Sequence, residues 1–211
     1  MSLFITFEGG DGSGKTYQSK ALHRKLTREG IASLITHEPG GTPLGNKIRG
    51  ILKQYNRSSI TPESELLLFN ACRIQLINEV IRPNLQRGVV VICDRFSDST
   101  MVYQGYGRGI DLKTVKAVNQ IALQEIRPDL TVLLDIPPEL GLKRKYNNAN
   151  DRFESQGITF QNRIRKGFLK LAEEEPDRWL VLDGLKPKRA IYNIIWNRVA
   201  DLLKANNIMD R

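Results

Sequence analysis

The chain has 211 residues, of which 40% are hydrophobic and 26% charged, and its formal net charge is +9 at pH 7. These values predict one globular domain, long enough to build a hydrophobic core without disulfides or a structural metal. No apolar run approaches the roughly 20 residues that a membrane span requires, and the residues before the first glycine-rich turn are too few for a signal peptide, so we expect no membrane partner.

Five short apolar runs predict the buried strands of a sheet. They are residues 3–7, 32–36, 89–93, 130–136 and 179–182. Helix-like stretches lie between and after them, at residues 15–28, 44–55, 62–81, 112–126 and 191–203. Strands that alternate with helices form parallel sheets covered on both faces. The sequence therefore predicts a single three-layer α/β domain over residues 1–211.

A glycine-rich loop, the phosphate loop, follows the first predicted strand and precedes the first predicted helix. Its residues are Gly9, Gly10, Asp11, Gly12, Ser13, Gly14, Lys15 and Thr16, which fit the pattern G-x-x-x-x-G-K-[ST]. The glycines let backbone N–H groups converge on phosphate oxygens, and the helix directs its positive end at the same anion. In such a loop the lysine lies near the β- and γ-phosphates and the threonine hydroxyl ligates Mg²⁺. The pattern predicts nucleotide binding but says little about the acceptor.

The third predicted strand delivers Asp94 and Arg95 at its carboxyl end. Ligands of open parallel sheets bind at that edge. Asp94 could hold Mg²⁺ directly or through water, and Arg95 could bind an acceptor phosphate with its planar guanidinium. The alternative is a surface ion pair.

Basic residues are enriched between Lys143 and Lys170. They are Lys143, Arg144, Lys145, Arg152, Arg163, Arg165, Lys166 and Lys170, against Asp151 and Glu154. A small polyanionic substrate explains this cluster as well as nucleic acid does. Elsewhere Lys and Arg are scattered without interleaved aromatics, so we expect no nucleic-acid partner. The polar run at residues 147–151 predicts a mobile loop.

The cysteines and histidines indicate no metal centre. Cys72 and Cys93 stand in no metal-ligand spacing, and His23 and His37 form no helical pair. We therefore expect reduced thiols in apolar surroundings and a cytoplasmic location.

Seven separated segments resemble the thymidylate kinase family, in the order in which that family carries them. They are residues 7–16, Glu38-Pro39-Gly40-Gly41-Thr42, residues 67–73, Asp94-Arg95-Phe96, Tyr103-Gln104-Gly105, residues 127–130, and Asp151-Arg152-Phe153-Glu154. The phosphate loop is common to many kinases, but the combination of Glu-Pro-Gly-Gly-Thr, Phe-x-x-x-Arg and Asp-Arg-Phe is specific. The resemblance covers roughly the whole chain.

The resemblance implies a P-loop NTPase fold with a five-stranded parallel sheet and a mobile lid at about residues 141–160. It implies transfer of a phosphoryl group from ATP to dTMP, with Mg²⁺, by a homodimer. Two alternatives stay open on the residues alone. One is a kinase for another nucleoside monophosphate or a deoxynucleoside, and the other is a P-loop ATPase or switch protein.

The resemblance also implies an acceptor site. Phe69 is expected to stack on thymine and Arg73 to reach the carbonyl edge of the base. Their spacing of four on a predicted helix places them on one face, although core packing is the alternative role for Phe69. Arg49 and Arg95 match positions that hold the monophosphate.

Four further positions match the rest of that site. Thr100 and Gln104 match positions near the base, and Tyr103 matches the residue against the sugar, where bulk disfavours a ribose 2′-OH. Asp11 matches the loop acid that approaches the sugar and phosphate end of the acceptor.

The chain departs from the family pattern at two positions. Some members carry an arginine directly after the loop acid, whereas this chain has Gly12. A lid arginine, Arg144 or Arg152, is then expected to supply the missing positive charge, and these join Lys15, Arg95 and Asp11 as the expected catalytic residues. His37 stands where an arginine often precedes Glu-Pro-Gly-Gly-Thr, and the sequence offers no account of it.

Overall fold

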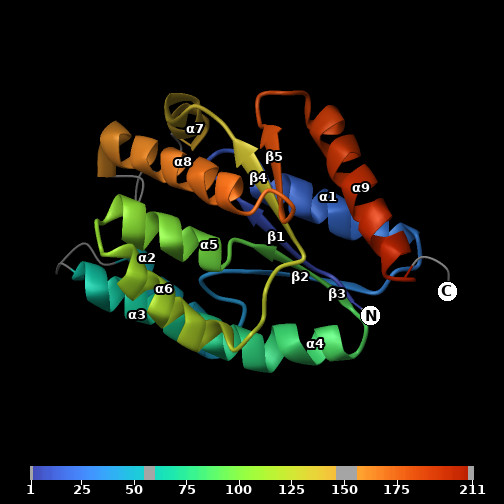
Figure 1. Ribbon diagram of the computed structural model, residues 1–211, viewed down its shortest axis with the longest axis horizontal. Coiled ribbons are helices and arrows are strands. Elements are labelled where there is room, and N and C mark those ends of the chain that lie inside the picture. The colour runs from blue at the N-terminus through green and yellow to red at the C-terminus, as the bar shows by residue number, and fades with distance from the viewer. Residues whose placement is uncertain (1, 55–59, 146–155, 209–211) are drawn as a thin grey trace.

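A five-stranded parallel sheet lies at the centre of the computed structural model, which describes residues 2–54, 60–145 and 156–208 (Figure 1). The strand order is β2-β3-β1-β4-β5. The strands are β1 (Phe4–Glu8), β2 (Ser33–His37), β3 (Val90–Asp94), β4 (Leu130–Asp135) and β5 (Trp179–Asp183). Each strand overlaps the apolar run that predicted it, with ends shifted by about one residue. The prediction of a five-stranded parallel sheet is confirmed.

Helices connect the strands and cover the sheet. They are α1 (Lys15–Arg28), α2 (Pro43–Gln54), α3 (Pro62–Leu76), α4 (Arg82–Gln86), α5 (Ser97–Thr100), α6 (Leu112–Leu123), α7 (Pro138–Lys145), α8 (Gly157–Glu174) and α9 (Lys188–Ala205), with π-helical segments η1 (Ile77–Ile81) and η2 (Met101–Gly107). The five predicted helical stretches correspond to α1, α2, α3 with η1, α6 and α9. The sequence did not predict the other segments.

Helix α8 explains the basic cluster that the sequence shows. Phe160, Ile164 and Phe168 recur every four residues on its buried side, while Arg163 and Lys166 are exposed. A helix with one apolar side packs that side on the core and turns its charges to solvent. This stretch of the cluster is the outer face of an amphipathic helix.

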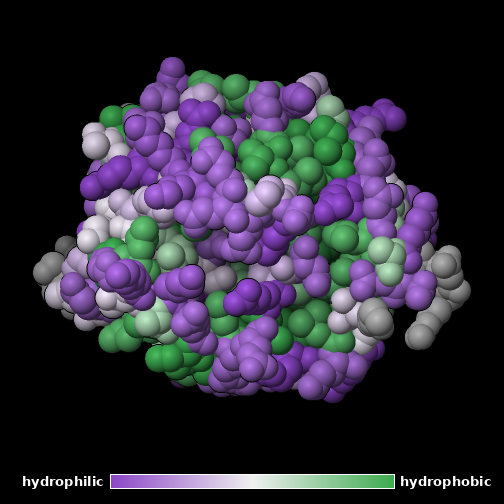
Figure 2. All heavy atoms as spheres, in the orientation of Figure 1, coloured by the Kyte–Doolittle hydropathy of each residue, from purple (hydrophilic) through white to green (hydrophobic). Residues whose placement is uncertain are grey.

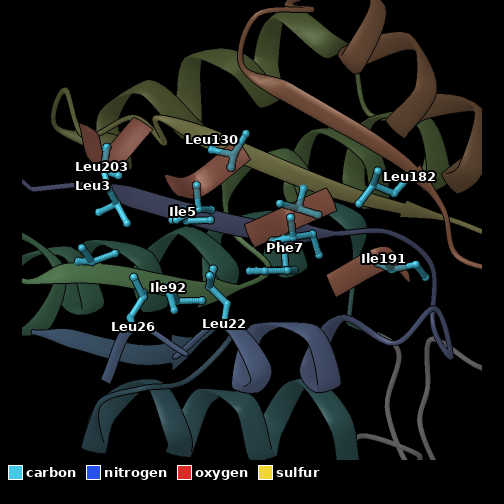
Figure 3. Close-up of a cluster of buried hydrophobic side chains, with 14 of the residues drawn as sticks. Leu3, Ile5, Phe7, Leu22, Leu26, Ile92, Leu130, Leu182, Ile191 and Leu203 are labelled. Atoms are coloured by element: carbon cyan, nitrogen blue, oxygen red, sulfur yellow. The ribbon is translucent and has the colours of Figure 1, made fainter. Parts of the chain in front are cut away.

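The side chains of β1 alternate between the two faces of the sheet. Ile5 and Phe7 pack with residues of α1 and α9, including Leu22 and Ile191, in one hydrophobic cluster (Figure 3). Phe4 packs on the opposite face with residues of α3, η1 and β3. Figure 1 shows α1 and α9 together on one side of the sheet. The predicted three-layer α/β arrangement is confirmed.

The strand order reverses direction at β1. The chain runs from β1 past the position of β3 to β2, and later from β3 across β1 to β4. The crevice beyond the carboxyl ends of the strands at such a point is where α/β proteins bind ligands. The phosphate loop follows β1 there, and the Arg95 N–H donates to Phe7 O at 2.9 Å, which holds the end of β3 beside that loop.

Within the described ranges, no helix is long and apolar enough to cross a membrane. Hydrophilic residues predominate on the face that Figure 2 shows, around smaller hydrophobic patches. The predicted lid at residues 141–160 begins in α7 and ends in α8. Its residues 146–155, which include Arg152 and the predicted mobile loop, lie outside the described residues, so the lid stays a prediction.

Candidate active site

A cavity of about 710 Å³ lies at the carboxyl ends of β1 and β3. Most of the site residues predicted from the sequence line it. They are Asp11, Gly12, Gly14, Lys15, Thr16, Arg49, Phe69, Arg73, Asp94, Arg95, Thr100, Tyr103, Gln104 and Arg144. Gly9 and Gly10 line a smaller cavity on the other side of the phosphate loop, and Arg152 lies outside the described residues. The structure therefore brings the predicted donor and acceptor residues together in one space.

The phosphate loop leads directly into α1. Gly14 precedes the helix with a φ of 97°, a left-handed conformation that favours glycine. The Lys15 ammonium is buried and donates to Gly9 O at 2.9 Å and Gly10 O at 2.8 Å. Burial, reinforced by the positive charge of Arg95, lowers the pKa of Lys15 to about 8. Bound phosphates would relieve both effects, so this ammonium is well placed for an anion.

Gly12 and Gly141 explain why the loop carries no arginine after Asp11. Gly12 has a φ of 72°, and a Cβ there would lie 2.3 Å from Gly141 O. A Cβ on Gly141 would likewise lie 2.3 Å from Asp11 O. The loop and α7 thus pack backbone against backbone. One turn further along α7, Arg144 Nη1 donates to Gly12 O at 3.3 Å, so a positive charge from another element lies at the loop.

Thr16 and Asp94 form an oxygen pair beside the loop. The Thr16 hydroxyl donates to Asp94 Oδ2 at 2.5 Å. Among the described residues, no cluster of three or more His, Cys, Asp or Glu side chains forms a metal site. Mg²⁺ in nucleotide sites usually binds one or two protein oxygens and takes its other ligands from phosphates and water. The Thr16 and Asp94 oxygens fit that kind of site.

Arg95 occupies a tight turn after β3 and contacts the phosphate loop. Its φ is 70°, which is uncommon for a residue with a side chain. Its guanidinium donates to Asp11 Oδ1 at 2.8 Å and to Gly9 O at 3.1 Å, and it lies 5.1 Å from the centre of the Tyr103 ring. These contacts hold the arginine between the loop and η2, on the wall of the cavity.

The Glu8 carboxylate holds this turn in place. It is fully buried and accepts from the Phe96 N–H at 2.8 Å, the Ser99 N–H at 3.3 Å and the Ser99 hydroxyl at 2.6 Å. Ser99 Oγ in turn accepts from Arg95 Nη1 at 3.3 Å. Burial raises the pKa of Glu8 to about 7, and repulsion from Asp98 adds to the rise. No pattern in the sequence pointed to a role for Glu8.

Arg73 is buried and lines the cavity, and protein acceptors surround its guanidinium. Glu38 accepts from Nε and Nη2, at 3.0 and 2.6 Å to Oε2. Thr100 Oγ1 accepts from Nη2 at 2.8 Å, while Asn70 and Asn119 accept from Nη1 at 3.1 and 3.0 Å. A guanidinium has five N–H donors, and these acceptors engage them all. The predicted contact with a base carbonyl stays a prediction and requires that oxygen to share a donor.

Phe69 has the core contacts that the sequence offered as its alternative role, and its stacking on thymine stays a prediction. It packs against the buried cluster of Ile48, Leu52 and Cys72, and it also lines the cavity. Arg49, from α2, lines the same cavity, and its Nη1 donates to Pro39 O at 2.6 Å. The cavity therefore offers both an aromatic side chain and an arginine from α3 and α2.

His37 lines the cavity near Arg49. Partial burial and the charge of Arg49 lower the pKa of this histidine from its usual value. A histidine at this position therefore places less positive charge beside Arg49 than an arginine would.

The fold, with its phosphate loop at the cavity, defines the class of P-loop phosphotransferases. The comparisons narrow this class. A family model described as thymidylate kinase matches residues 7–195. A thymidylate kinase of Dehalococcoides mccartyi is 52% identical over 207 residues, which cover 98% of this chain and 100% of that protein. The chain belongs to the thymidylate kinase family.

More distant relatives are thymidylate kinases as well. A thymidylate kinase of Geotalea uraniireducens is 46% identical over 191 residues, which cover 87% of this chain and 90% of that protein. The crystal structure of a thymidylate kinase from Ehrlichia chaffeensis matches this fold with a TM-score of 0.76 at 33% identity, over 94% of this chain and 98% of that one.

Proposed function

We propose that this chain transfers the γ-phosphoryl group of ATP to dTMP, giving ADP and dTDP. Membership of the thymidylate kinase family supports this reaction. The observation that carries the proposal is the single cavity in which the phosphate loop faces Arg49, Phe69 and Arg95. A cavity that holds both reactants supplies the alignment on which phosphoryl transfer depends.

The donor phosphates bind at the phosphate loop in this proposal. The loop amides and the N-terminus of α1 surround them, and Lys15, now held by Gly9 and Gly10, turns its ammonium to their oxygens. Thr16 and Asp94 would hold Mg²⁺, which when bound neutralises part of the phosphate charge. Asp11 keeps Arg95 at the edge of the loop.

The acceptor binds in the other half of the cavity. Arg49 and Arg95 hold the monophosphate in line with the γ-phosphate, and Phe69 stacks on the base. Thr100, Tyr103 and Gln104 close the sugar and base end. The acceptor phosphate is already an anion at neutral pH, so the reaction needs no general base.

Positive charge at the transferring group comes from α7 in this proposal. Arg144 already reaches the loop at Gly12 O. It lies within the predicted lid at residues 141–160, which also carries Arg152 as the second candidate. Closing a cavity over the reactants excludes water and limits hydrolysis of ATP.

We also propose a homodimer and a cytoplasmic location. Leu67 on α3 and Ile121 on α6 are 59% and 73% exposed, and these two helices pack together, so their outer face is suited to a second copy. Sedimentation velocity that shows a monomer at micromolar concentration would contradict the dimer. Recovery of the activity from a membrane or secreted fraction would contradict the location.

The test of the function is a coupled ADP-release assay with ATP, Mg²⁺ and one acceptor at a time. The acceptors are dTMP, dUMP, dCMP, AMP and GMP, with a control that lacks any acceptor. We expect dTMP to give the highest kcat/KM. Faster turnover with a purine or cytosine nucleotide would keep phosphoryl transfer but contradict the assignments of Phe69 and Arg73. ADP release that ignores every acceptor would contradict the proposed function.

A further inference from the structure

The side-chain amide of Gln104 has a fixed orientation. Gln104 and Glu65 are both buried, with 1% and 0% of their surface exposed, and Gln104 Nε2 donates to Glu65 Oε1 at 2.7 Å. A carboxylate in an ion pair accepts hydrogen bonds and donates none. The amino end of the amide therefore faces Glu65, and the carbonyl end, Oε1, faces away from it.

Arg108 holds Glu65 in this position. Its Nε and Nη2 donate to Glu65 Oε1 and Oε2, each at 3.1 Å, in a two-pronged ion pair. The guanidinium also lies 5.1 Å from the centre of the Phe160 ring, and its Nη1 donates to Gln156 at 2.7 Å. An arginine bound on several sides gives the carboxylate little freedom to rotate.

Gln104 lines the cavity together with Arg73 and with Thr100, which lies four residues earlier in the chain and accepts from Arg73 Nη2 at 2.8 Å. The guanidinium of Arg73 offers donors only, and hydrogen bonds to four residues, Glu38, Asn70, Thr100 and Asn119, engage them. In the part of the cavity near Arg73, Gln104 Oε1 therefore supplies an acceptor. The N3–H of thymine or uracil is a donor, whereas the N3 of cytosine is a second acceptor.

We propose that Glu65, held by Arg108, is a positioning residue that selects the acceptor base by fixing the carbonyl end of Gln104 toward the ring N3–H. This inference rests on the proposed function, because it concerns the acceptor half of the same cavity. It assigns the discrimination against cytosine to two residues that need not touch the substrate. A polar site that matches one base leaves its own groups unpaired with the wrong one, which gives strong discrimination.

The test is Glu65→Gln, measured as kcat/KM for dTMP, dUMP and dCMP. A glutamine at position 65 both donates and accepts, so the Gln104 amide is free to turn over and present its amino end to N3. We expect the ratio of kcat/KM for dTMP to that for dCMP to fall by about tenfold or more. The ratio of dTMP to dUMP stays unchanged, since both bases carry N3–H.

The matched control is Glu63→Gln, the same chemical change at an exposed position of α3. It leaves both ratios at the wild-type values. Gln104→Met, which keeps the length of the side chain and removes the amide, tests the proposal even if Glu65→Gln fails to fold, and it also lowers the dTMP-to-dCMP ratio.

Two results would overturn the inference. In one, Glu65→Gln lowers kcat/KM for all three nucleotides by the same factor, as a purely structural role predicts. In the other, Gln104→Met keeps the wild-type ratio. An assay of the wild-type enzyme distinguishes these results from a failure of the proposed function. The proposed function fails only if the wild type does not phosphorylate dTMP.

Discussion

Three buried carboxylates each fix one side chain that faces the cavity. Glu8 holds the turn that carries Arg95, Glu38 binds Arg73, and Glu65 orients Gln104. Each accepts from groups far along the chain, at separations of 88, 35 and 39 residues. Buried carboxylates are costly unless they are paired or hydrogen-bonded, so their presence marks positions where geometry matters more than hydrophobic packing.

The stability of the fold is expected to depend on the protonation of Glu8. Its pKa rises from 4.5 to about 7 in the folded state, chiefly because burial disfavours the charged form. The folded protein therefore retains a proton that the unfolded chain releases. The stabilisation is complete below pH 4.5 and is lost as the pH rises through about 7.

Glu8→Gln tests this dependence by chemical denaturation between pH 5 and 8. The variant has no proton to lose at this position. The free energy of unfolding of the wild type, relative to the variant, is expected to fall across that range by up to about 3 kcal/mol. Two curves that stay parallel across the range would show that Glu8 does not titrate there.

The residues that face the cavity were largely predictable from the sequence, whereas the carboxylates that hold them were not. Asp94 and Arg95 could be predicted because they directly follow an apolar strand. Glu8 ends the first strand and is the only charged residue in it, which in hindsight is a signal. Glu8 meets its partners Phe96 and Ser99 because β1 pairs with β3, and the sequence does not show that pairing.

Among the elements, the phosphate loop and α7 make an unusually close contact, backbone against backbone. Gly12 and Gly141 allow a backbone approach that any Cβ would prevent. This approach brings Arg144 to the loop from a separate helix. The absence of an arginine after Asp11 and the presence of Arg144 are therefore parts of one arrangement.

Arg144→Ala is expected to lower kcat about 100-fold or more, because one positive group is lost where charge develops in the transition state. The KM for dTMP should change little. Lys143→Ala, at the exposed neighbouring position of α7, is the matched control and is expected to stay within about twofold of the wild type. Equal losses in the two variants, or no loss in Arg144→Ala, would leave Arg152 as the remaining lid candidate.

The sequence did not predict α8 and η2, and each omission has a physical reason. In α8 the basic residues conceal the apolar repeat of Phe160, Ile164 and Phe168. The segment η2 is π-helical, and its N–H to C=O bonds span five residues, as in the bond from Arg108 N to Tyr103 O. Such a segment follows neither the α-helical nor the strand period. It nevertheless carries Tyr103 and Gln104 into the cavity.

At the scale of the whole molecule, the site is assembled by the order of the strands. β1 and β3 are neighbours although β2 lies between them in sequence. This adjacency brings the phosphate loop next to Asp94 and Arg95 and turns the helices that follow toward one cavity. The five strands and the fold class could be predicted from apolar runs, but the strand order and the shape of the cavity depend on tertiary packing.

A cavity that passes a phosphoryl group from ATP to dTMP must form dTDP and ADP together. Chromatography of a reaction with ATP, dTMP and Mg²⁺ follows the dTDP formed and the ADP released in the same samples. We expect equal amounts of the two products at every time point, and no ADP above background without dTMP. ADP that accumulates without dTDP would show that the cavity hydrolyses ATP and does not transfer its phosphoryl group to dTMP.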